Sequence, residues 1–301
     1  MFDSRHIKTF HAVVTAGSYS AAARALGYTQ PAVTQQMKAL ERSVGTPLFT
    51  RVGRGMRLTE AGEALARHAE TILHSLTVAQ QQMSSLTRLR AGRVRVCAFP
   101  SAGATLIPEA LARLAADHPG VRVELLEGEP PESLRRLVRG ECDITLAFTY
   151  PGLHEEVPEE LAEIPLLEDQ LTVLLPAGHP LARRRAVKLA DLMDERWIAG
   201  CLRCRSNFLH ECAEVGFAPD IAFTTDDNLV VQSLVAEGLG VAMMPGLVLS
   251  FLRHDKVTVR ALDPASRRQV SAYVLREHLR VPATALVLDE LRAAAERRVG
   301  C

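Results

Sequence analysis

The segment SAAARALGYTQPAVTQQMKALERSVG, residues 20–45, is the part of the chain that most restricts its fold. It holds two short helical patterns separated by the tight turn LGYTQP. Thr29 is a suitable N-cap for the second helix, Pro31 falls in its first turn, where a missing N–H is harmless, and Gly45 ends it. A short helix, a tight turn and a second helix predict a helix-turn-helix.

The residues on either side extend this motif into a small domain. IKTFHAVVTAG places Ile7, Phe10 and Val13 on one helical face, and Ser20 is expected to cap the helix that follows. After the motif, PLFTRVGRGMRLT has two glycines between basic and β-prone residues, which is typical of a hairpin. Residues 1–58 are therefore predicted to form a mainly helical winged helix-turn-helix domain.

Residues 59–90 are predicted to form one long linker helix. Its apolar residues recur at steps of four and three, close to a heptad seam, and are Ala61, Leu65, Ala69, Ile72, Leu76, Ala79, Met83 and Leu86. Such a narrow stripe needs an apolar partner, which is either the helix's own domain or a second copy of the helix. We favour the second copy, so this helix is expected to join two chains.

Residues 91–301 alternate between strand and helix patterns. Strands are predicted at VRVCAF, VRVELLEG, CDITLAFT, LTVLLP, RWIAG, IAFTT, GVAMMPG and SAYVLR. Helices are predicted between or after them, for example TLIPEALARLAADHPG, PESLRRLVRG and VPATALVLDELRAAAERR. This alternation predicts mixed, largely parallel sheets covered by helices, in two similar subdomains.

Charge divides the chain into two parts. Residues 1–60 hold eight lysines and arginines against three acidic residues, a net charge of +5, so residues 61–301 of this neutral chain carry −5. A basic N-terminal fifth favours an anionic partner there. The start MFDSRHIKTFHAVV lacks a signal-peptide pattern, and no segment stays apolar for about 20 residues. We therefore expect a cytoplasmic protein without membrane contact, whose six cysteines are thiols.

Three segments resemble one family. FHAVVTAGSYSAAARALGYTQPAVTQQMKALERSVGTPLFTRVGRGMRLTEAGE resembles the highly specific N-terminal signature of LysR-type transcriptional regulators. FPSAGATLIPEALARLAADHPGVRVELLEGEP and VAEGLGVAMMPGLV resemble, more loosely, the start and the later part of their effector domain. The resemblance covers essentially the whole chain. It implies a winged helix-turn-helix, a dimerising linker helix and a two-lobed α/β effector domain like the type 2 periplasmic binding proteins.

The resemblance also implies a function. It places lobe I at residues 91–164 and 268–301 and lobe II at residues 165–267, within an effector domain spanning residues 91–301. The expected protein is a sequence-specific transcriptional regulator that binds double-stranded promoter DNA as a homodimer or homotetramer, with RNA polymerase as a further partner. A small effector between the lobes is expected to modulate it. Because the α/β region has no nucleophile elbow, P-loop or dinucleotide fingerprint, neither an enzyme nor a cofactor is expected.

The helix QPAVTQQMKALE is expected to enter the major groove. Its apolar residues face inward, so the polar residues that face outward are Gln30, Thr34, Gln35 and Lys38. Glutamine can donate and accept at adenine, threonine offers a hydroxyl and a methyl group, and lysine suits phosphate or guanine. The resemblance supports Gln30, Pro31 and Thr34 at the DNA. Many relatives carry Arg where this chain has Gln35, whose alternative role is that of a solvated side chain.

Further DNA contacts are expected around this helix. Arg51, Arg54 and Arg57 lie on or beside the predicted hairpin, where arginines grip phosphate or reach into a minor groove, unless they are ordinary surface charges. Ser18 and Ser20 lie at a helix start, which can hold a phosphate, although capping is the simpler role for Ser20. Each phosphate contact should add about 0.9 to the salt dependence of binding.

Two loops are expected to line the effector cleft. AFPSAGAT and AGCLRCRSN each follow a strand and begin a helix, the usual place for a ligand in α/β domains. Helix N-termini favour anions, so the expected effector is small and polar or anionic. The predicted effector-binding residues are Ser101, Ala102, Gly103, Phe148, Cys201, Arg203 and Cys204. Ser101 can also serve as a simple N-cap.

Three cysteines and a histidine gather in GCLRCRSNFLHECAEVGF, residues 200–217. A zinc site is disfavoured because His210 and Cys212 are two positions apart on a helix and point in different directions. Cys212 is instead expected to be buried on the face of Phe208 and Leu209. No metal is predicted.

Cys201 and Cys204 allow a second interpretation. They lie near a helix N-terminus beside Arg203 and Arg205, and both features lower the pKa of a thiol. CLR resembles the tripeptide at the sensing cysteine of peroxide-responsive family members, although their second sensing cysteine falls where this chain has His210. A redox sensor that uses these two thiols is therefore the alternative to a small-molecule sensor. A third role for Cys201 and Cys204 is to line the cleft or to pack in the core, and this role requires no reactive thiol.

Overall fold

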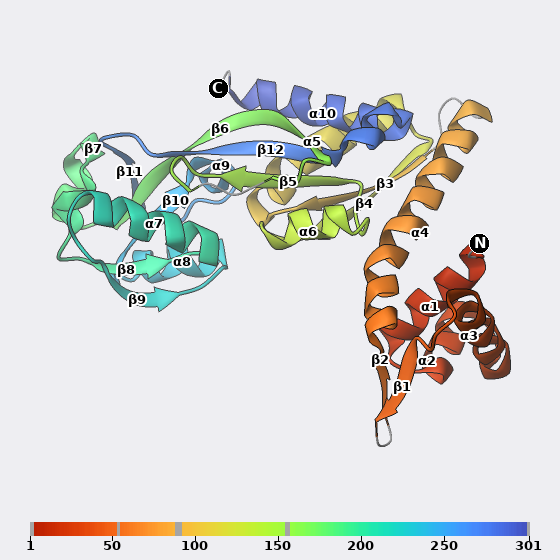
Figure 1. Cartoon of the computed structure of the whole chain (residues 1–301). Coiled ribbons are helices and arrows are strands. Elements are labelled where there is room, and N and C mark those ends of the chain that lie inside the picture. Colours follow the sequence, from red (N-terminus) through yellow and green to blue (C-terminus); the bar gives the residue numbers. More distant parts are fainter. Residues whose placement is uncertain (1–2, 53–54, 88–91, 154–156, 300–301) are drawn as a thin grey trace. The chain divides into compact units, whose positions relative to one another are not determined.

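The structure is a computed structural model that describes residues 3–52, 55–87, 92–153 and 157–299. The chain separates into two compact units, one formed by residues 1–89 and 138–141 and the other by the remaining residues (Figure 1). Among the described helices, none is long and apolar enough to cross a membrane. The predicted limits of the domains and of the two lobes stay predictions.

Three helices begin the first unit: α1 (Ser4–Ala16), α2 (Tyr19–Leu26) and α3 (Gln30–Val44). Each ends at a glycine with φ between 68° and 83°, namely Gly17, Gly27 and Gly45. Glycine adopts this left-handed conformation without strain, so the three helices end where the sequence predicts.

The helix caps confirm one prediction and correct another. Thr29 caps α3, since its hydroxyl accepts a hydrogen bond from the N–H of Ala32. The predicted cap of α2 is wrong, because Ser18 rather than Ser20 accepts from the N–H of Ala21. Ser18 has the extended backbone of an N-cap, with φ −158° and ψ 151°, whereas Ser20 already lies inside the helix. The hydroxyl of Ser20 is therefore available for another contact.

The predicted hairpin follows the three helices. It consists of β1 (Phe49–Val52) and β2 (Gly55–Leu58), which pair antiparallel with Phe49 opposite Leu58. The Phe49 ring lies 5.4 Å from that of Phe10 in α1, so the hairpin is attached to the helical core. That core is made of Ile7, Phe10, Val13, Ala22, Ala23, Val33, Met37, Leu40, Leu48, Leu65 and Ala69.

The long helix predicted next is α4 (Glu60–Thr87). Its first turn lies close to the backbone before the hairpin, because a Cβ at Gly62 would be 2.2 Å from the carbonyl oxygen of Leu48. Leu65 and Ala69 are buried in the core of the three helices. The first half of the predicted apolar seam therefore packs on its own domain.

The second half of the α4 seam has different surroundings. Leu76 is 41% exposed and Ala79 is exposed as well. The side chains of Met83 and Leu86 lie outside the described residues. The seam thus divides into a part that its own domain covers and a part in which the described apolar side chains face solvent.

The second unit is built on a ten-stranded mixed sheet. Its strands are β3 (Gly92–Ala98), β4 (Val121–Glu127), β5 (Ile144–Thr149), β6 (Leu161–Pro176), β7 (Ala186–Val187), β8 (Arg196–Ala199), β9 (Asp220–Thr224), β10 (Val241–Pro245), β11 (Val257–Leu262) and β12 (Arg267–Leu275). The main order is β4-β3-β5-β12-β6-β10-β8-β9, and β11 pairs with β6 and β7. The outer strands β3, β4 and β5 on one side and β8, β9 and β10 on the other are parallel within each group.

The strand β6 joins the two halves of the sheet. Residues 161–170 pair antiparallel with β12, and residues 171–176 pair with β10 and β11. The sequence predicted only LTVLLP, the second part of β6, and it missed β7 and β11. Acidic residues break the apolar pattern of the first part, and Pro165 falls where the register with β12 shifts between Val270 and Ser271. A bulge of this kind accommodates a proline within a sheet.

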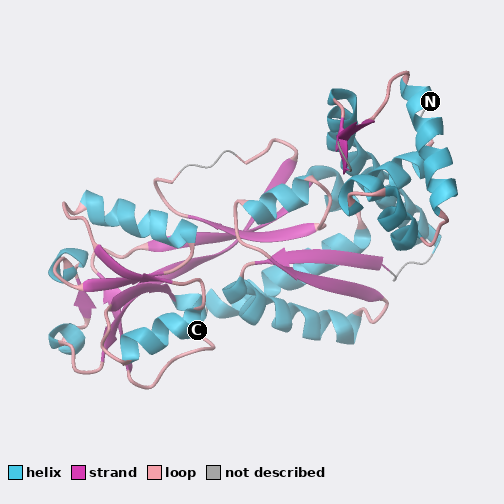
Figure 2. Cartoon of the chain, turned by 90° about the horizontal axis from the view of Figure 1, so that it is seen from below, coloured by secondary structure: helices cyan, strands magenta, loops and turns pink. Residues whose placement is uncertain are grey.

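Helices cover both halves of this sheet (Figures 1 and 2). They are α5 (Pro100–Asp117), α6 (Glu132–Val138), α7 (Leu202–Glu214), α8 (Asn228–Ala236), α9 (Gly246–Leu249) and α10 (Pro282–Val299), with short 3₁₀ turns η1 (Pro180–Arg183), η2 (Leu189–Leu192) and η3 (Arg276–Arg280). In Figure 1, α5 and α10 lie together over β3, β5 and β12, with α6 on the opposite face. The helix α5 begins at Pro100, so AFPSAGAT is mostly helix rather than loop.

Candidate functional site

The outward face of α3 forms a shallow groove with a volume of about 540 Å³. The groove is lined by Gln30, Pro31, Thr34, Gln35, Lys38 and Arg42. The opposite face of α3 carries Val33, Met37 and Leu40, whose exposed fractions are at most 1%. Five residues predicted from the sequence thus share one groove. Arg42 was missed, although its position one helical turn beyond Lys38 was the available signal.

The side chains of the α3 groove are exposed, apart from the half-buried Thr34, and their hydrogen bonds lie mostly within their own helix. The hydroxyl of Ser20 donates a 3.0 Å hydrogen bond to Oε1 of Gln30, which leaves the Gln30 amide N–H groups directed to other partners. The Thr34 hydroxyl donates to the backbone carbonyl of Gln30, and the Arg42 guanidinium donates to that of Lys38. The groove therefore offers amide, ammonium and guanidinium donors, which suit phosphate oxygens and the acceptors of base edges.

The hairpin contributes less to the described surface. Arg57 in β2 is exposed and lies opposite Thr50. Arg51 lies in β1, but its side chain is outside the described residues, as is the whole of Arg54. The expected contacts of these two arginines with DNA stay predictions.

A second site lies at the centre of the sheet unit. This central cleft has a volume of about 40 Å³. It is lined by Phe99, Pro100, Ser101, Glu129, Gly200, Cys201, Cys204, Asp226, Asn228, Val231, Met243, Met244, Pro245, Val248 and Arg268. These residues come from both halves of the sheet, and they include the first turns of α5, α7 and α8. The cleft is small because side chains from the two halves meet in it.

Four predicted effector-binding residues lie outside the lining of the central cleft. Ala102 lies in α5 and is fully buried, and Gly103 is half-exposed on the same helix. Phe148 is 1% exposed and lies below the cleft, against the Phe99 ring. Arg203 is buried as well, with its guanidinium 5.8 Å from the centre of the Phe148 ring. For Ala102, Gly103 and Arg203 helical spacing explains this outcome, since residues one or two positions apart on a helix face different directions.

The dominant charged group of the cleft is Arg268, at the start of β12. Its guanidinium donates to Asp169 over 2.8 to 2.9 Å and to the hydroxyl of Ser101 over 3.0 Å. It also lies 4.6 Å from the centre of the Phe148 ring and 5.1 Å from that of Phe99. Ser101 is therefore a partner of a buried arginine rather than the predicted N-cap, because Phe99 occupies the cap position without a side-chain bond.

Asp169 completes the network. It is 5% exposed, and its second oxygen accepts a 2.8 Å hydrogen bond from the N–H of Leu247, at the start of α9. Buried charges of opposite sign are held in place by such bonds, since leaving one unpaired in a low dielectric is costly. The network links β6, β12, α5 and α9 into one rigid wall of the cleft.

Glu129 adds a carboxylate to the lining of the cleft. Burial raises the pKa of Glu129 above its ordinary value, and the nearby Asp226 carboxylate raises it further. The sequence analysis missed Glu129, Asp169 and Arg268. No local pattern distinguishes them, because their positions are set by contacts between segments far apart in the chain, such as the 99 residues that separate Asp169 from Arg268.

The two cysteines of the α7 N-terminus lie next to each other in the cleft. Cys201 Sγ donates to Cys204 Sγ over 2.6 Å, and the N–H of Cys204 donates back to Cys201 Sγ over 3.4 Å. The bond from Cys201 lowers the pKa of Cys204, and Arg268 and Tyr150 act in the same direction. The same bond and burial raise the pKa of Cys201.

Part of the thiol prediction is therefore wrong. The pKa of Cys201 is raised rather than lowered. The cation that lowers the pKa of Cys204 is Arg268, since the Arg203 guanidinium lies over Phe148 instead. Cys212 is fully buried beside Phe208, as predicted, but Leu209 is 41% exposed. Within the described residues, no three His, Cys, Asp or Glu side chains are grouped to hold a metal ion.

The fold and the two sites define a class of protein. A basic helix-turn-helix with a wing is a module that reads DNA. A two-part α/β domain with a central cleft is a module that holds a small molecule. Both lie in one chain, which is the arrangement of a ligand-responsive DNA-binding regulator.

Comparison with known proteins gives the family. The sequence matches bacterial regulatory helix-turn-helix proteins of the lysR family over residues 4–63 and the LysR substrate binding domain over residues 87–296. The second match covers more than half of the chain, and the chain belongs to the LysR family. It is a LysR-type DNA-binding transcriptional regulator with an effector-binding domain.

Individual relatives match most of the chain. The uncharacterised HTH-type transcriptional regulator YybE of Bacillus subtilis is 28% identical over 254 residues, 83% of this chain and 84% of that protein. The full-length structure of an OxyR variant from Pseudomonas aeruginosa is 21% identical, with a TM-score of 0.74, and covers 97% of this chain and 95% of its own. The full-length structure of CbnR complexed with its target DNA has a TM-score of 0.66 at 21% identity, with 97% and 100% covered. At this identity, both structures show the fold alone.

Proposed function

We propose that this regulator binds promoter DNA through the α3 groove, with base edges read by Gln30, Thr34 and Gln35. The observation that carries this proposal is that the predicted polar residues line one exposed groove above a fully apolar face. Lys38 and Arg42 lie further along the same helix and suit phosphates. Ser20 holds the Oε1 atom of Gln30, which fixes the direction in which the Gln30 amide donates.

Two copies of the chain present two such grooves. We propose that the exposed part of the α4 seam, from Leu76 onward, pairs with a second copy, because the first part is already covered by its own domain. A homodimer would read two half-sites, and a homotetramer would be a pair of such dimers. A cytoplasmic location and a contact with RNA polymerase are expected from the same role.

The central cleft is the proposed effector site. Ser101, Cys201 and Cys204 lie in it together with Arg268 and Glu129. The first turns of α5 and α7 favour a polar or anionic effector, whereas the Glu129 carboxylate opposes an anion until it is protonated. An effector would have to separate the two halves of the sheet unit, since the cleft now encloses only about 40 Å³.

A mobility shift and a footprint on the DNA upstream of the chain's own gene test the DNA interface. Wild type should protect a defined segment, and Gln35→Ala should weaken or redistribute that protection. Thr15→Ala, on the exposed end of α1 outside the groove, is the matched control and should bind as wild type does. Absence of any binding at low salt would contradict the regulator function itself.

A thiol sensor is the second candidate, favoured by the 2.6 Å separation of the Cys201 and Cys204 sulfurs. Hydrogen peroxide would oxidise the Cys204 thiolate to a sulfenate with release of water. The Cys201 thiol would then attack the Cys204 sulfur and form a disulfide, with the sulfenate oxygen and the thiol proton leaving together as hydroxide. Two electrons pass from the two thiols to one peroxide.

The same footprint distinguishes the two candidates. Peroxide should change the footprint of the wild type and leave that of Cys201→Ser and Cys204→Ser unchanged if the thiols are the sensor. A wild-type footprint that ignores peroxide would remove the thiol candidate and leave the small-molecule effector.

A further inference from the structure

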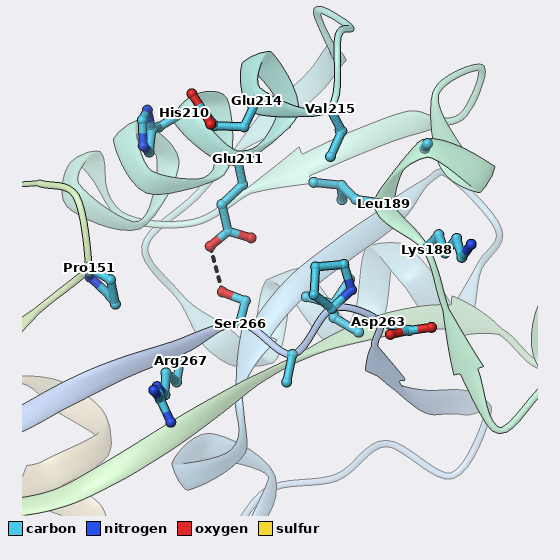
Figure 3. A pocket seen from close by; sticks show the side chains of 14 residues that line it. Pro151, Lys188, Leu189, His210, Glu211, Glu214, Val215, Asp263, Ser266 and Arg267 are labelled. Atoms are coloured by element: carbon cyan, nitrogen blue, oxygen red, sulfur yellow. Dashed lines mark hydrogen bonds between the residues drawn. The ribbon is translucent and has the colours of Figure 1, made fainter.

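A second, larger pocket lies away from the central cleft. We call it the α7 pocket, with a volume of about 670 Å³ (Figure 3). It is lined by Pro151, Lys188, Leu189, Ala190, His210, Glu211, Glu214, Val215, Leu262, Asp263, Pro264, Ala265, Ser266 and Arg267. Most of these residues come from the C-terminal half of α7, from the turn η2 and from the end of β11 to the start of β12, and Pro151 comes from the segment after β5. Its volume lies in the range of sites that hold small organic molecules.

The floor of the α7 pocket is apolar. Leu189 and Leu262 are buried there, with exposed fractions of 7% and 6%. Val215, at the end of α7, points toward Leu189 across the pocket (Figure 3). Apolar walls of this kind suit the hydrocarbon part of a ligand.

One carboxylate is held in a fixed position on the pocket wall. Glu211 Oε1 accepts hydrogen bonds from the amide of Asn207 over 2.7 Å and from the hydroxyl of Ser266 over 2.5 Å. Asn207 is 2% exposed, so this support belongs to the interior of the protein. Glu211 Oε2 receives no hydrogen bond from the described residues and extends toward the middle of the pocket in Figure 3. A charged acceptor with a locked side chain is the feature expected of a binding group.

The charges around the pocket favour a cation. Glu211, Glu214 and Asp263 supply three carboxylates, against the single ammonium group of Lys188 and the guanidinium of Arg267. Arg267 already pairs with Glu168 over 3.1 Å, outside the pocket lining, which offsets its charge. The remaining balance is negative, and a positively charged ligand would complement it.

We propose that the α7 pocket binds a small organic cation, with its ammonium group on Glu211 and its apolar body against Leu189, Val215 and Leu262. This site is distinct from the central cleft and does not depend on which effector the cleft takes. The two sites share α7, whose first turn lines the cleft and whose last turns line the pocket. They also share β12, because Arg267 lines the pocket and the next residue, Arg268, lines the cleft.

Isothermal titration of the full chain with 2-phenylethylammonium tests the site at low ionic strength. The amine should bind saturably at one site per chain. The uncharged 2-phenylethanol and the anion 3-phenylpropionate have similar apolar bodies and should bind at least about tenfold more weakly, the effect of one charge-assisted hydrogen bond. Equal binding of the amine and the alcohol would overturn the proposal.

Two variants place the binding in this pocket. Glu211→Gln removes the charge and should weaken amine binding by about tenfold or more. Val215→Phe fills the apolar space and leaves residue 211 unchanged. It locates the binding site if Glu211→Gln does not fold. Asp194→Asn removes an exposed charge of the same unit outside the pocket and is the matched control. Wild-type affinity in Val215→Phe, or an equal loss in Asp194→Asn, would contradict the assignment.

Trp197 provides an independent readout. It is the chain's single tryptophan, it is fully buried, and its ring lies 4.4 Å from that of Phe208 in α7. Amine binding against α7 should change its fluorescence with the same saturation midpoint as the titration. A DNA mobility shift on the same samples tests the proposed function separately. A failure of amine binding would therefore not contradict DNA binding, and a failure of DNA binding would not contradict amine binding.

Discussion

The α3 groove and the central cleft both gather polar side chains, but they hold them in opposite ways. In the α3 groove, Gln35 and Lys38 are exposed, and the neighbouring Thr34 and Arg42 donate to backbone carbonyls of the same helix. In the cleft, Arg268 is 2% exposed and bonded to Asp169 and Ser101 from other elements. The first surface keeps its donors available, and the second fixes them before any ligand arrives.

The difference follows from the size of the two partners. DNA supplies its own rigid array of phosphates and base edges, so the protein needs only accessible donors at the correct spacing. A small effector supplies few groups, so the protein must position its own charges in a desolvated site. Substitutions in the groove should therefore affect DNA binding and spare stability, whereas substitutions in the cleft should lower stability first.

The largest effect is expected from the buried ion pair. Asp169→Ala leaves the Arg268 guanidinium buried without its carboxylate and should lower the free energy of unfolding by about 3–5 kcal/mol. Glu168→Ala breaks the adjacent, exposed pair with Arg267 and should lower it by less than about 1 kcal/mol. Urea denaturation of both variants measures the difference, and equal losses would show that the cleft is not prearranged.

A smaller effect is expected from a substitution in the α3 groove, where DNA binding should weaken and the free energy of unfolding should stay nearly the same. Gln35→Ala should weaken specific DNA binding by about 1–3 kcal/mol if Gln35 reads a base, with unfolding changed by less than about 0.5 kcal/mol. Fluorescence anisotropy with upstream DNA measures the first quantity and urea denaturation the second. If the affinity of Gln35→Ala for this DNA equals that of the wild type, Gln35 is a solvated side chain that reads no base.

The phosphate contacts predict a change in salt dependence. Lys38→Gln and Arg42→Gln should each reduce the slope of log affinity against log salt by about 0.9 per bound chain, and so by about 1.8 for the proposed homodimer, without altering sequence preference. Binding isotherms at several salt concentrations measure the slope. A slope that stays at the wild-type value in both variants would exclude both residues from phosphate contact.

The smallest effect is expected in the pH dependence of the free energy of unfolding, and it comes from Glu129 in the central cleft. Because burial raises the pKa of Glu129 above its ordinary 4.5, the folded state favours the protonated carboxyl. The resulting stability is fully present below 4.5 and is lost as the pH rises through the raised value. Between pH 8 and pH 5, the wild type should gain stability relative to Glu129→Gln, while the exposed Asp194→Asn should follow the wild type. Parallel curves for all three proteins would refute this prediction.

Local sequence patterns predict most of the helix ends and faces of the first unit, but they do not predict the charged network of the central cleft. The end of α3 at Gly45, its cap at Thr29 and its two faces all follow from residues within one or two turns of each other. The cap of α2 was misplaced by two positions because Ser18 and Ser20 are chemically equivalent candidates, and only backbone geometry separates them.

The cleft depends on contacts that no local pattern contains. Ser101 and Arg268 are 167 positions apart, and Asp169 lies between them on the long strand β6, whose first half the sequence analysis missed. AFPSAGAT is predicted as a loop, but α5 already begins at Pro100, and the low helix propensity of serine and glycine hides this first turn from a local pattern. Cys201 and Cys204 could be located from the sequence, but the direction of each pKa shift depends first on the hydrogen bond between the two thiols, which raises the pKa of Cys201 and lowers that of Cys204.

Hydrogen–deuterium exchange of the full chain, with and without DNA from upstream of its gene, compares the two regions directly. We expect DNA to slow exchange most strongly in α3 and in the β1–β2 hairpin. The exchange rates of the backbone amides around Ser101 and Arg268 should change least, because the hydrogen bonds of the Arg268 network are already formed in the free protein. If DNA slowed exchange most strongly in the second unit, or nowhere, the assignment of the α3 groove as the DNA-binding surface would be wrong.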